Sequence, residues 1–547
     1  MTRGRGFCSA PYARGRVGGY MESGRQLSKF TAIFAGGTFV SRISGFIREM
    51  VWFALIPTQS IGPFLVAFKF PNMLRDLVGE GATNAAFIPV FSESIEKESK
   101  EAFRDLVSAT MSAMLIVLGV LTVLGLLLLP FLSQSMGFFG TVSAKAVAGQ
   151  RIELIISLSL WTFPYLFFIG MTVFAMGPLF TVRHYATPSW SPALLNVAVI
   201  LCCWKLAPLF VGRGIDPAYA LVVGVWLGGI AQLVVQYMAL AKYAGVWLPN
   251  FHLTHPAIPT MFLLLLPVLI GQSTGEVNKF VDTLFAAVLG DDKVKALTAA
   301  NRLIQLPFSI FGLAVAAAVL PAASRAGARQ DFEEIRYTLI HGLRQTFFLV
   351  FPSSVGLICL RGPIVRLLFE RGNFTAVDTG QTATAVLLYG LGLLSFVWVK
   401  VLVSGFYAVK DTKTPVIVAS ASMVLNILLN FAMVKPLGYK GLAIATTISY
   451  TVNFAVLYAL LCARFGSLWD REFAVALLRM IVAGSIMLAV AYGVNRRILL
   501  YFPTSRLYSV VIPIFCASAV YAVLCYFLDV PDLRSFLDVL CGKREES

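Results

Sequence analysis

Long apolar stretches recur along the whole chain, each about as long as a crossing of the bilayer requires. A helix needs roughly 20 apolar residues to span the hydrocarbon core. The chain is 58% hydrophobic and only 13% charged, and soluble domains carry about 25% charged residues. The sequence therefore predicts an all-α polytopic membrane protein. Its fourteen expected transmembrane helices lie near residues 30–56, 61–92, 106–132, 152–180, 189–210, 217–241, 257–289, 296–323, 341–360, 380–408, 415–434, 441–463, 474–493 and 507–528.

Both ends of the chain are expected on the cytoplasmic side of the membrane. An even number of crossings returns the chain to its starting side, and the loops of that side hold more Lys and Arg than the others. Such an excess favours the cytoplasm. Residues 1–29 lack the apolar core of a signal peptide, and Met21 is an alternative first residue. We expect residues 1–29 to be a basic, disordered cytoplasmic tail and residues 529–547 to be a second cytoplasmic tail.

Two short motifs occur twice at nearly the same spacing. VRHYATP at residues 182–188 matches VKDTKTP at residues 409–415, an offset of 227. A Pro-x-x-Ser pattern at residues 89–92 recurs at residues 321–324, an offset of 232. Two matches at similar offsets indicate a duplicated unit.

The duplication predicts two six-helix lobes with the same orientation in the membrane. The first lobe, helices 1–6, spans residues 30–241, and the second, helices 7–12, spans residues 257–463. Residues 474–528 add a helix pair with no counterpart in the repeat. Transporters are often built from such repeats, with the substrate site where the halves meet.

Positively charged residues are predicted inside several of the apolar helices. Each central Arg or Lys facing lipid would cost about 2.5 to 3.5 kcal/mol, so these side chains should line a water-filled cavity. The acids in the same segments, Glu49, Asp76 and Glu80, are fewer than the bases. The surplus predicts a central cationic cavity and an anionic cargo. The bases are Arg42, Arg48, Lys69, Arg75, Arg302 and Lys400.

The second predicted helix carries a polar stripe. Lys69, Asn72 and Asp76 share one face, and Pro71 removes a backbone hydrogen bond beside them. A kinked, polar helix suits a moving gate. The alternative is a set of salt bridges, such as Arg42 with Glu49, that only holds the helices together.

Other classes of function have little support in the sequence. It contains no phosphate-binding Walker loop, no H-E-x-x-H or G-x-S-x-G motif, and no C-x-x-C pair among its eight cysteines. No basic run alternates with aromatic residues as nucleic-acid binding would require. We therefore expect a transporter without catalytic residues, without a resident cofactor or metal, and without a nucleic-acid partner.

Several motifs resemble the MurJ/MviN family of lipid II flippases, within the multidrug/oligosaccharidyl-lipid/polysaccharide exporter superfamily. The first helix carries SRISGFIR at residues 41–48, and the second carries VAFKFPNMLR at residues 66–75, followed by EGA at 80–82. Further matches extend to the eleventh helix and cover most of the chain. They are NR at residues 301–302, LP at 320–321, LFERGNF at 368–374, KVLVSGFY at 400–407 and KTP at 413–415.

The resemblance implies a flippase that moves lipid II from the inner to the outer leaflet by alternating access, and we expect the protein to be a monomer. Lipid II is an undecaprenyl-diphosphate-linked muropeptide, and its transport serves peptidoglycan and cell-wall biogenesis and cell shape in the bacterial inner membrane. The expected diphosphate-binding arginines are Arg42, Arg48, Arg75 and Arg302, with Glu80 as an accompanying acid. Lys69, Asn72 and Lys400 complete the expected substrate-binding set. Helices 13 and 14 would form a groove for the polyprenyl tail, among the membrane lipids.

The chain departs from the family pattern at two positions and leaves the energy source open. Gly62 and Asn301 stand where the family commonly has acids, so gating contacts through those acids must be weaker or replaced. Sodium or the membrane potential could supply the energy. The residues in the region of a sodium site are Asp282, Asn426, Asn430 and Thr446, with Asn430 contributing no negative charge.

Three alternatives remain open at this stage. The cargo could be another polyprenyl-linked glycan. A multidrug antiporter of the same superfamily would call for an acidic cavity if its drugs are cationic. A membrane-embedded lipid phosphatase or glycosyltransferase would need clustered acids, His or Ser at a membrane face.

Overall fold

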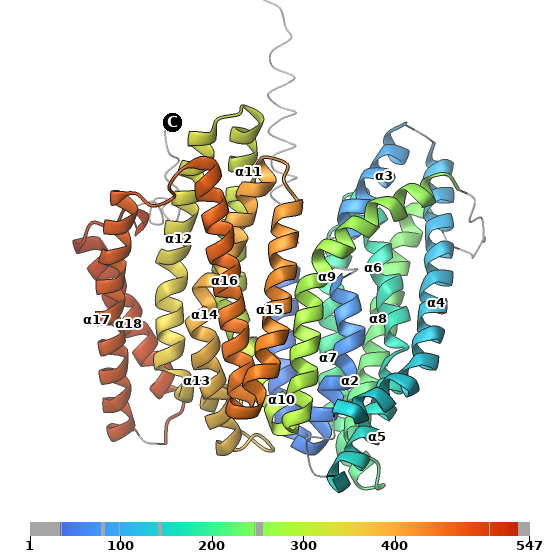
Figure 1. Ribbon diagram of the computed structural model, residues 1–547. Coiled ribbons are helices and arrows are strands. Elements are labelled where there is room, and N and C mark those ends of the chain that lie inside the picture. Colours follow the sequence, from blue (N-terminus) through green and yellow to red (C-terminus); the bar gives the residue numbers. More distant parts are fainter. Residues whose placement is uncertain are drawn as a thin grey trace, which may run out of the picture.

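The computed structural model describes residues 33, 36–77, 83–97, 99–139, 145–245, 247, 255–502 and 504–533. Throughout these residues the chain forms helices and no strands (Figure 1). Eleven helices in this part of the chain are long and apolar enough to cross a membrane. The protein is an all-α polytopic membrane protein, as the sequence predicts.

The first lobe comprises an opening helix over residues 36–55 and the helices α2 to α8. Their bounds are α2 (Thr58–Leu77), α3 (Thr83–Lys97), α4 (Lys100–Phe139), α5 (Lys145–Thr162), α6 (Tyr165–Thr181), α7 (Ala186–Val211) and α8 (Ala218–Ala244).

The second lobe extends from α9 to α16, and the pair α17 and α18 follows it. Their bounds are α9 (Ala257–Leu289), α10 (Asp291–Pro307), the π-helix η3 (Phe308–Gly312), α11 (Leu313–Ala328), α12 (Phe332–Cys359), α13 (Arg361–Leu368), α14 (Ala376–Ala408), α15 (Lys413–Leu437), α16 (Tyr439–Phe465), α17 (Arg471–Tyr501) and α18 (Tyr508–Phe527).

Three predicted helices are interrupted. Helix 152–180 is split into α5 and α6 just before Tyr165, because Pro164 lacks an N–H group to continue the helix. Helix 296–323 consists of α10 and α11 with η3 between them, directly after Pro307. Helix 61–92 is observed as α2 and α3, and residues 78–82 between them lie outside the described residues.

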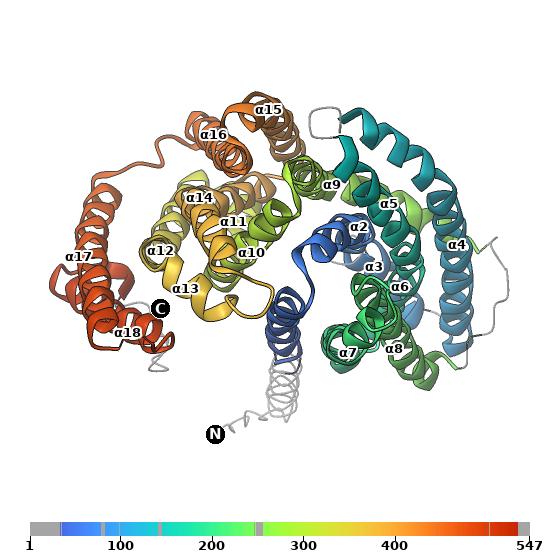
Figure 2. The ribbon, with the colours of Figure 1, turned by 90° about the horizontal axis from the view of Figure 1, so that it is seen from below.

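Two groups of helices lie side by side (Figure 2). Helices α7 and α8 pack closely in the first lobe, and α14 and α16 do so in the second. The lobes meet where α2 contacts α9 and α10. Helix α17 packs against α18 and against α12, so the added pair is attached to the outside of the second lobe.

The two copies of the seven-residue motif form the same turn. Arg183 and Lys410, at equivalent positions, both have a φ of 61°. Each also donates its backbone N–H to the carbonyl three residues earlier, and the next residue donates to the carbonyl five residues earlier. The turn after α6 therefore repeats after α14, as expected for duplicated helical units.

Candidate anion-binding site

Two arginines from different lobes share one buried carboxylate. Arg48 Nη2 lies 3.5 Å from Glu49 Oε1, and Arg302 Nε lies 3.4 Å from Glu49 Oε2. Arg48 and Glu49 belong to the opening helix, whereas Arg302 lies on α10. Glu49 is only 6% exposed, so its charge depends on these two guanidinium groups for compensation. Together, the three side chains carry one positive charge more than they carry negative.

Asn196 on α7 orients Arg48. Its Oδ1 accepts a hydrogen bond from Arg48 Nη1 at 3.0 Å. Its Nδ2 donates to the Ser41 carbonyl at 3.0 Å and to Ser44 Oγ at 2.9 Å. The other side of the arginine faces Trp52, whose ring centroid lies 4.6 Å from Arg48 Cζ. One buried amide thus holds both the opening helix and its arginine.

Gly45 provides the space in which Arg302 approaches the opening helix. A Cβ atom added at Gly45 would lie 2.8 Å from Arg302 Nη2, which is closer than real contacts of this kind. The missing side chain therefore allows the guanidinium of the second lobe to lie against the helix of the first. Gly45 is one turn before Glu49, which the same arginine contacts.

Arg75 and Lys69 on α2 extend the positive charge of this cluster. Arg48 is repelled electrostatically by both Arg302 and Arg75. Lys69 interacts with the carboxylates of Glu49 and Asp282. The structure thus brings Arg48, Arg75, Arg302 and Lys69 into one electrostatic neighbourhood, with Glu49 at its centre.

The other expected site residues differ in exposure and position. Arg42 is exposed and forms no ion pair with any residue that the structure describes. Asn72 is half-buried on α2. Lys400 is exposed on α14, and its nearest charged neighbours include Lys279 and Glu276 of α9. Glu80 falls outside the described residues.

The residues considered for sodium do converge. Asp282 accepts hydrogen bonds from Asn430 Nδ2 at 2.7 Å and from Thr446 Oγ1 at 3.1 Å, and Asn430 Nδ2 also lies 2.9 Å from Asn426 Oδ1. The Oδ1 atom of Asn430 is buried and has no hydrogen-bond partner among the described residues. Oxygen atoms are the ligands that hard cations prefer, so the donor type suits a monovalent cation, with a single carboxylate to balance its charge.

A separate cavity of about 650 Å³ lies between α17 and the ends of α12, α13 and α14. Its lining is mostly apolar and includes Ile358 and Leu488, with Arg361, Ser485 and Tyr492 as polar residues. The sequence predicts a groove formed by helices 13 and 14 of the fourteen, which are α17 and α18. The observed lining comes from α17 and the second lobe, and α18 contributes none of it.

Comparison with known proteins identifies the family. The family model described as "Lipid II flippase MurJ" matches residues 58–512, most of the chain. The chain belongs to the MurJ family. The matched range includes Arg75, Arg302 and Lys400, whereas Arg48 and Glu49 precede it.

Individual members of the MurJ family match over most of their length. A protein of Vibrio cholerae described as "Probable lipid II flippase MurJ" is 34% identical over 438 residues, which cover 79% of this chain and 82% of the relative. "Lipid II flippase MurJ" of Burkholderia cenocepacia is 32% identical over 429 residues, covering 78% of this chain and 81% of the relative.

Solved structures of the superfamily share the fold. A structure described as "Lipid II flippase MurJ, inward closed conformation" superposes with a TM-score of 0.73 at 26% identity, covering 90% of this chain and 98% of that one. An inward-facing multidrug resistance transporter of the MATE family, in the MOP superfamily, gives a TM-score of 0.65 at 18% identity, covering 78% of this chain and 95% of that one. The second comparison supports the fold alone.

The sequence predicts Arg48, Arg75 and Arg302 in the site. It does not predict Asn196, the contact of Arg302 with Gly45, or the sharing of Glu49 by two arginines. An isolated Asn in the apolar run of α7 was the available signal for Asn196. Its partner, Arg48, lies 148 positions earlier in the chain.

Proposed function

We propose that the protein is a flippase that moves lipid II from the inner to the outer leaflet of the bacterial cytoplasmic membrane, and that it works as a transporter with no chemical conversion of its cargo. Family membership supports this function. The observation that carries the proposal at residue level is the sharing of Glu49 by Arg48 and Arg302, because it joins the two lobes through groups that also suit a diphosphate.

The diphosphate of the cargo would bind by competing with Glu49 for the same guanidinium groups. Arginine presents a planar set of N–H donors that can grip phosphate oxygens in pairs, and it stays charged. Arg48 is already oriented by Asn196, so little of its freedom remains to be lost on binding. Arg302 would bind the same diphosphate from the second lobe. Cargo binding would therefore be coupled to the relative position of the lobes.

The polyprenyl tail would remain in contact with lipid and with the cavity beside α17. The apolar lining of that cavity suits a hydrocarbon chain, and its volume of about 650 Å³ can hold only part of a long tail. We place both termini in the cytoplasm and the cargo in the central site of a monomer. The excess of Lys and Arg in the loops on the side of the termini supports this orientation.

Energy would come from the membrane potential or from sodium. For sodium, Asp282, Asn426, Asn430 and Thr446 would hold the ion, with the unpartnered Asn430 Oδ1 as an additional oxygen ligand. Bound sodium would neutralise Asp282 between α9 and the α15–α16 pair. These four residues would then hold the three helices in one arrangement.

A multidrug antiporter is the second candidate, because MATE transporters share the fold. The charge of the site argues against it for cationic drugs. Arg48 and Arg302 exceed the single carboxylate of Glu49, and the neighbouring Arg75 and Lys69 are also basic. An exporter of another polyprenyl-linked glycan would use the same diphosphate chemistry and differ only in its sugar contacts.

Complementation tests the proposal. We expect Arg48→Ala and Arg302→Ala to abolish growth of cells depleted of their own lipid II flippase, at unchanged protein level. Arg325→Ala provides the matched control, because Arg325 is an exposed arginine in the last turn of α11. Normal growth with both site variants would refute the proposal. Translocation of defined lipids in vesicles separates lipid II from other polyprenyl-linked glycans.

A further inference from the structure

One end of the molecule is closed by contacts between the lobes, and a fully buried lysine lies among them. Lys295, in the first turns of α10, is 0% exposed. Its Nζ atom lies 2.8 Å from Asp378 Oδ2 and 2.6 Å from Thr58 Oγ1, and it donates to the Asn373 carbonyl at 3.2 Å. Asp378 and Asn373 belong to the second lobe, whereas Thr58 begins α2 of the first. The lysine therefore spans the boundary between the lobes.

An ion pair crosses the same boundary one turn away. The Nε atom of Arg151, on α5, lies 2.6 Å from Asp291 Oδ1. The Nη1 atom of the same arginine donates to the Ala287 carbonyl at 2.5 Å. Gly62 of α2 lies directly against Asp291, since an added Cβ would come within 2.4 Å of the aspartate Cβ. Asp291 comes from the opposite lobe, and an acid at position 62 would both clash with it and repel it.

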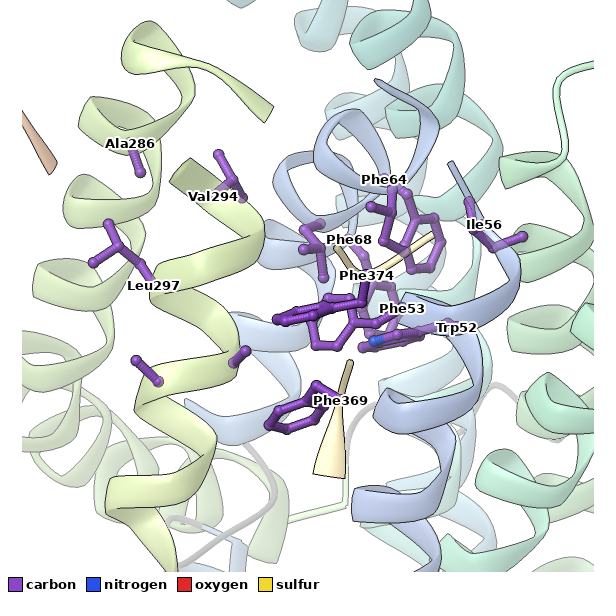
Figure 3. Packing of buried hydrophobic residues seen from close by; sticks show 14 of the residues in the cluster. Trp52, Phe53, Ile56, Phe64, Phe68, Ala286, Val294, Leu297, Phe369 and Phe374 are labelled. Atoms are coloured by element: carbon purple, nitrogen blue, oxygen red, sulfur yellow. The ribbon is translucent and has the colours of Figure 1, made fainter. Parts of the chain in front are cut away.

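An apolar layer lies beside these polar contacts. Figure 3 shows Phe53 of the opening helix together with Phe369 and Phe374 of the second lobe. The Phe53 ring centroid lies 5.8 Å from that of Phe369 and 5.9 Å from that of Phe374. The Asn373 backbone N–H also donates to the Ala54 carbonyl at 2.9 Å. The layer excludes water from the part of the boundary around Lys295, whose Nζ atom lies 5.0 Å from the Phe374 ring centroid.

If the lobes moved apart, Lys295 would keep some of its bonds and lose others. The partner that neutralises its charge, Asp378, belongs to the same lobe and would move with it. The bond that would break is the one that Lys295 donates to the uncharged hydroxyl of Thr58. Arg151 and Asp291 would separate, but both side chains are already partly exposed, at 21% and 15%, so water can reach them. Separation would therefore strand no unpaired charge in a dry place, and closure can be reversible.

We propose that Lys295, Thr58, Arg151 and Asp291 form a latch that holds this end of the transport path closed, and that transport requires the Lys295–Thr58 and Arg151–Asp291 contacts to break. The role of the latch in transport rests on the proposed function. The closing of this end by contacts between the lobes is independent of that function.

The test measures the distance between the lobes at the closed end. Spin labels are placed at Arg213→Cys, in the turn between α7 and α8, and at Lys440→Cys, next to the turn between α15 and α16, in a background with the native cysteines replaced. Both positions are exposed, and each lies near the start of α2 or α10: Asp216 accepts a hydrogen bond from Ser60 at 3.0 Å, and the Tyr439 ring centroid lies 5.3 Å from Lys293 Nζ. Pulsed electron paramagnetic resonance on the full-length protein in nanodiscs then gives the populations of closed and open states.

We expect a predominantly short distance in the parent protein. Thr58→Val removes only the hydrogen bond from the Lys295 ammonium group across the boundary, and it should raise the ratio of open to closed states roughly tenfold to a hundredfold, because hydrogen bonds to charged groups are the stronger class. Arg151→Ala should raise it about twofold to fivefold, and the exchange Arg151→Asp with Asp291→Arg should return it towards the parent value. Arg329→Ala is the matched control, because it breaks a pair with Glu334 on the exposed surface of the second lobe.

Unchanged distance distributions in both Thr58→Val and Arg151→Ala would overturn the latch. If Arg151→Ala shifts the distance distribution and the exchanged pair does not reverse the shift, the Arg151–Asp291 ion pair is not part of the latch. The measurement needs no cargo, so its outcome is separate from the complementation test. A latch that opens in these variants while Arg48→Ala and Arg302→Ala still support growth would refute the proposed function and leave the latch intact.

Discussion

Asn196 shows how one uncharged residue can determine the properties of a charged site. It accepts a hydrogen bond from Arg48 and donates two to the opening helix, while it is itself 5% exposed. A buried amide with these partners can have only a narrow range of orientations. The direction in which Arg48 presents its remaining N–H groups is therefore set by α7, a helix distant from it in sequence.

We predict that Asn196→Leu weakens diphosphate binding and leaves the fold in place. The Arg48 guanidinium loses an acceptor, and a hydrogen bond to a charged group is worth about 1.5 to 3 kcal/mol, which corresponds to roughly tenfold to a hundredfold in affinity. Binding of pyrophosphate or lipid II to the purified protein measures the change. Asn196→Gln serves as the conservative comparison, and affinity equal to the parent in Asn196→Leu would contradict the positioning role.

The sequence predicts which residues are charged at membrane depth, but not which of them meet. Arg48 and Arg302 were expected in the site because burying them in lipid would be costly. Their common partner Glu49 and the close approach over Gly45 depend on how two lobes pack, which no local pattern contains. Lys295 and Asp291 were missed for a simpler reason. The predicted helix begins near residue 296, whereas the observed one begins at Asp291, so the prediction places both residues in a loop.

At the scale of the elements, the repeated turns after α6 and α14 differ in the group that closes them. In the second turn, Asp411 accepts hydrogen bonds from the Thr414 backbone N–H at 3.1 Å and from the Thr414 hydroxyl at 2.8 Å. In the first turn, His184 Nε2 lies 2.6 Å from Thr187 Oγ1 at the equivalent spacing. Only the carboxylate brings a charge to the start of the following helix, where a negative charge is favourable.

We predict that acid weakens the turn at Asp411. Hydrogen bonds from the Thr414 backbone hold the pKa of Asp411 below its ordinary value of 3.8. The stabilisation is therefore fully present above that ordinary value and is lost as the pH falls through the lowered one. Asp411→Asn should destabilise the protein at pH 7 and reduce the loss of thermal stability between pH 5 and pH 3, as measured by thermal unfolding in detergent. An identical pH dependence in the variant would contradict the assignment.

The interrupted helices mark the limit of prediction from hydropathy. Apolar runs identify where the chain crosses the membrane, and each predicted segment coincides with helix in the described residues. They do not reveal the turn before Tyr165 or the π-helical segment after Pro307, because prolines inside other helices, such as Pro63 and Pro71 of α2, leave the α-helix regular. Neighbouring helices decide which prolines interrupt a helix and which are accommodated.

At the scale of the whole molecule, the two clusters of charge lie at different places between the lobes. Glu49 and its arginines join the lobes through groups that a diphosphate could displace, whereas Lys295, Arg151 and Asp291 join them through groups of the protein alone. A cargo that takes Arg302 away from Glu49 weakens one connection and leaves the other. The contacts of Lys295, Arg151 and Asp291 would then determine what fraction of the protein is open before cargo binds. The sharing of Glu49 by the arginines would make that fraction depend on cargo.

Because the cargo would carry its negative charge outward, the membrane potential should act directly on transport. An elementary charge that crosses 100 mV gains or loses about 2.3 kcal/mol, which corresponds to roughly fiftyfold in an equilibrium. We predict that an inside-negative potential accelerates outward movement of lipid II in vesicles and that an inside-positive potential slows it.

The measurement is repeated with and without a sodium gradient, in the parent protein and in Asp282→Asn, whose change removes the single carboxylate of the candidate sodium site. If the potential supplies the energy, Asp282→Asn keeps the voltage response and neither protein responds to sodium. If sodium supplies it, the gradient accelerates the parent protein and has no effect on Asp282→Asn. A rate that follows neither voltage nor sodium would exclude both sources and leave binding and release of the cargo as the only driving step.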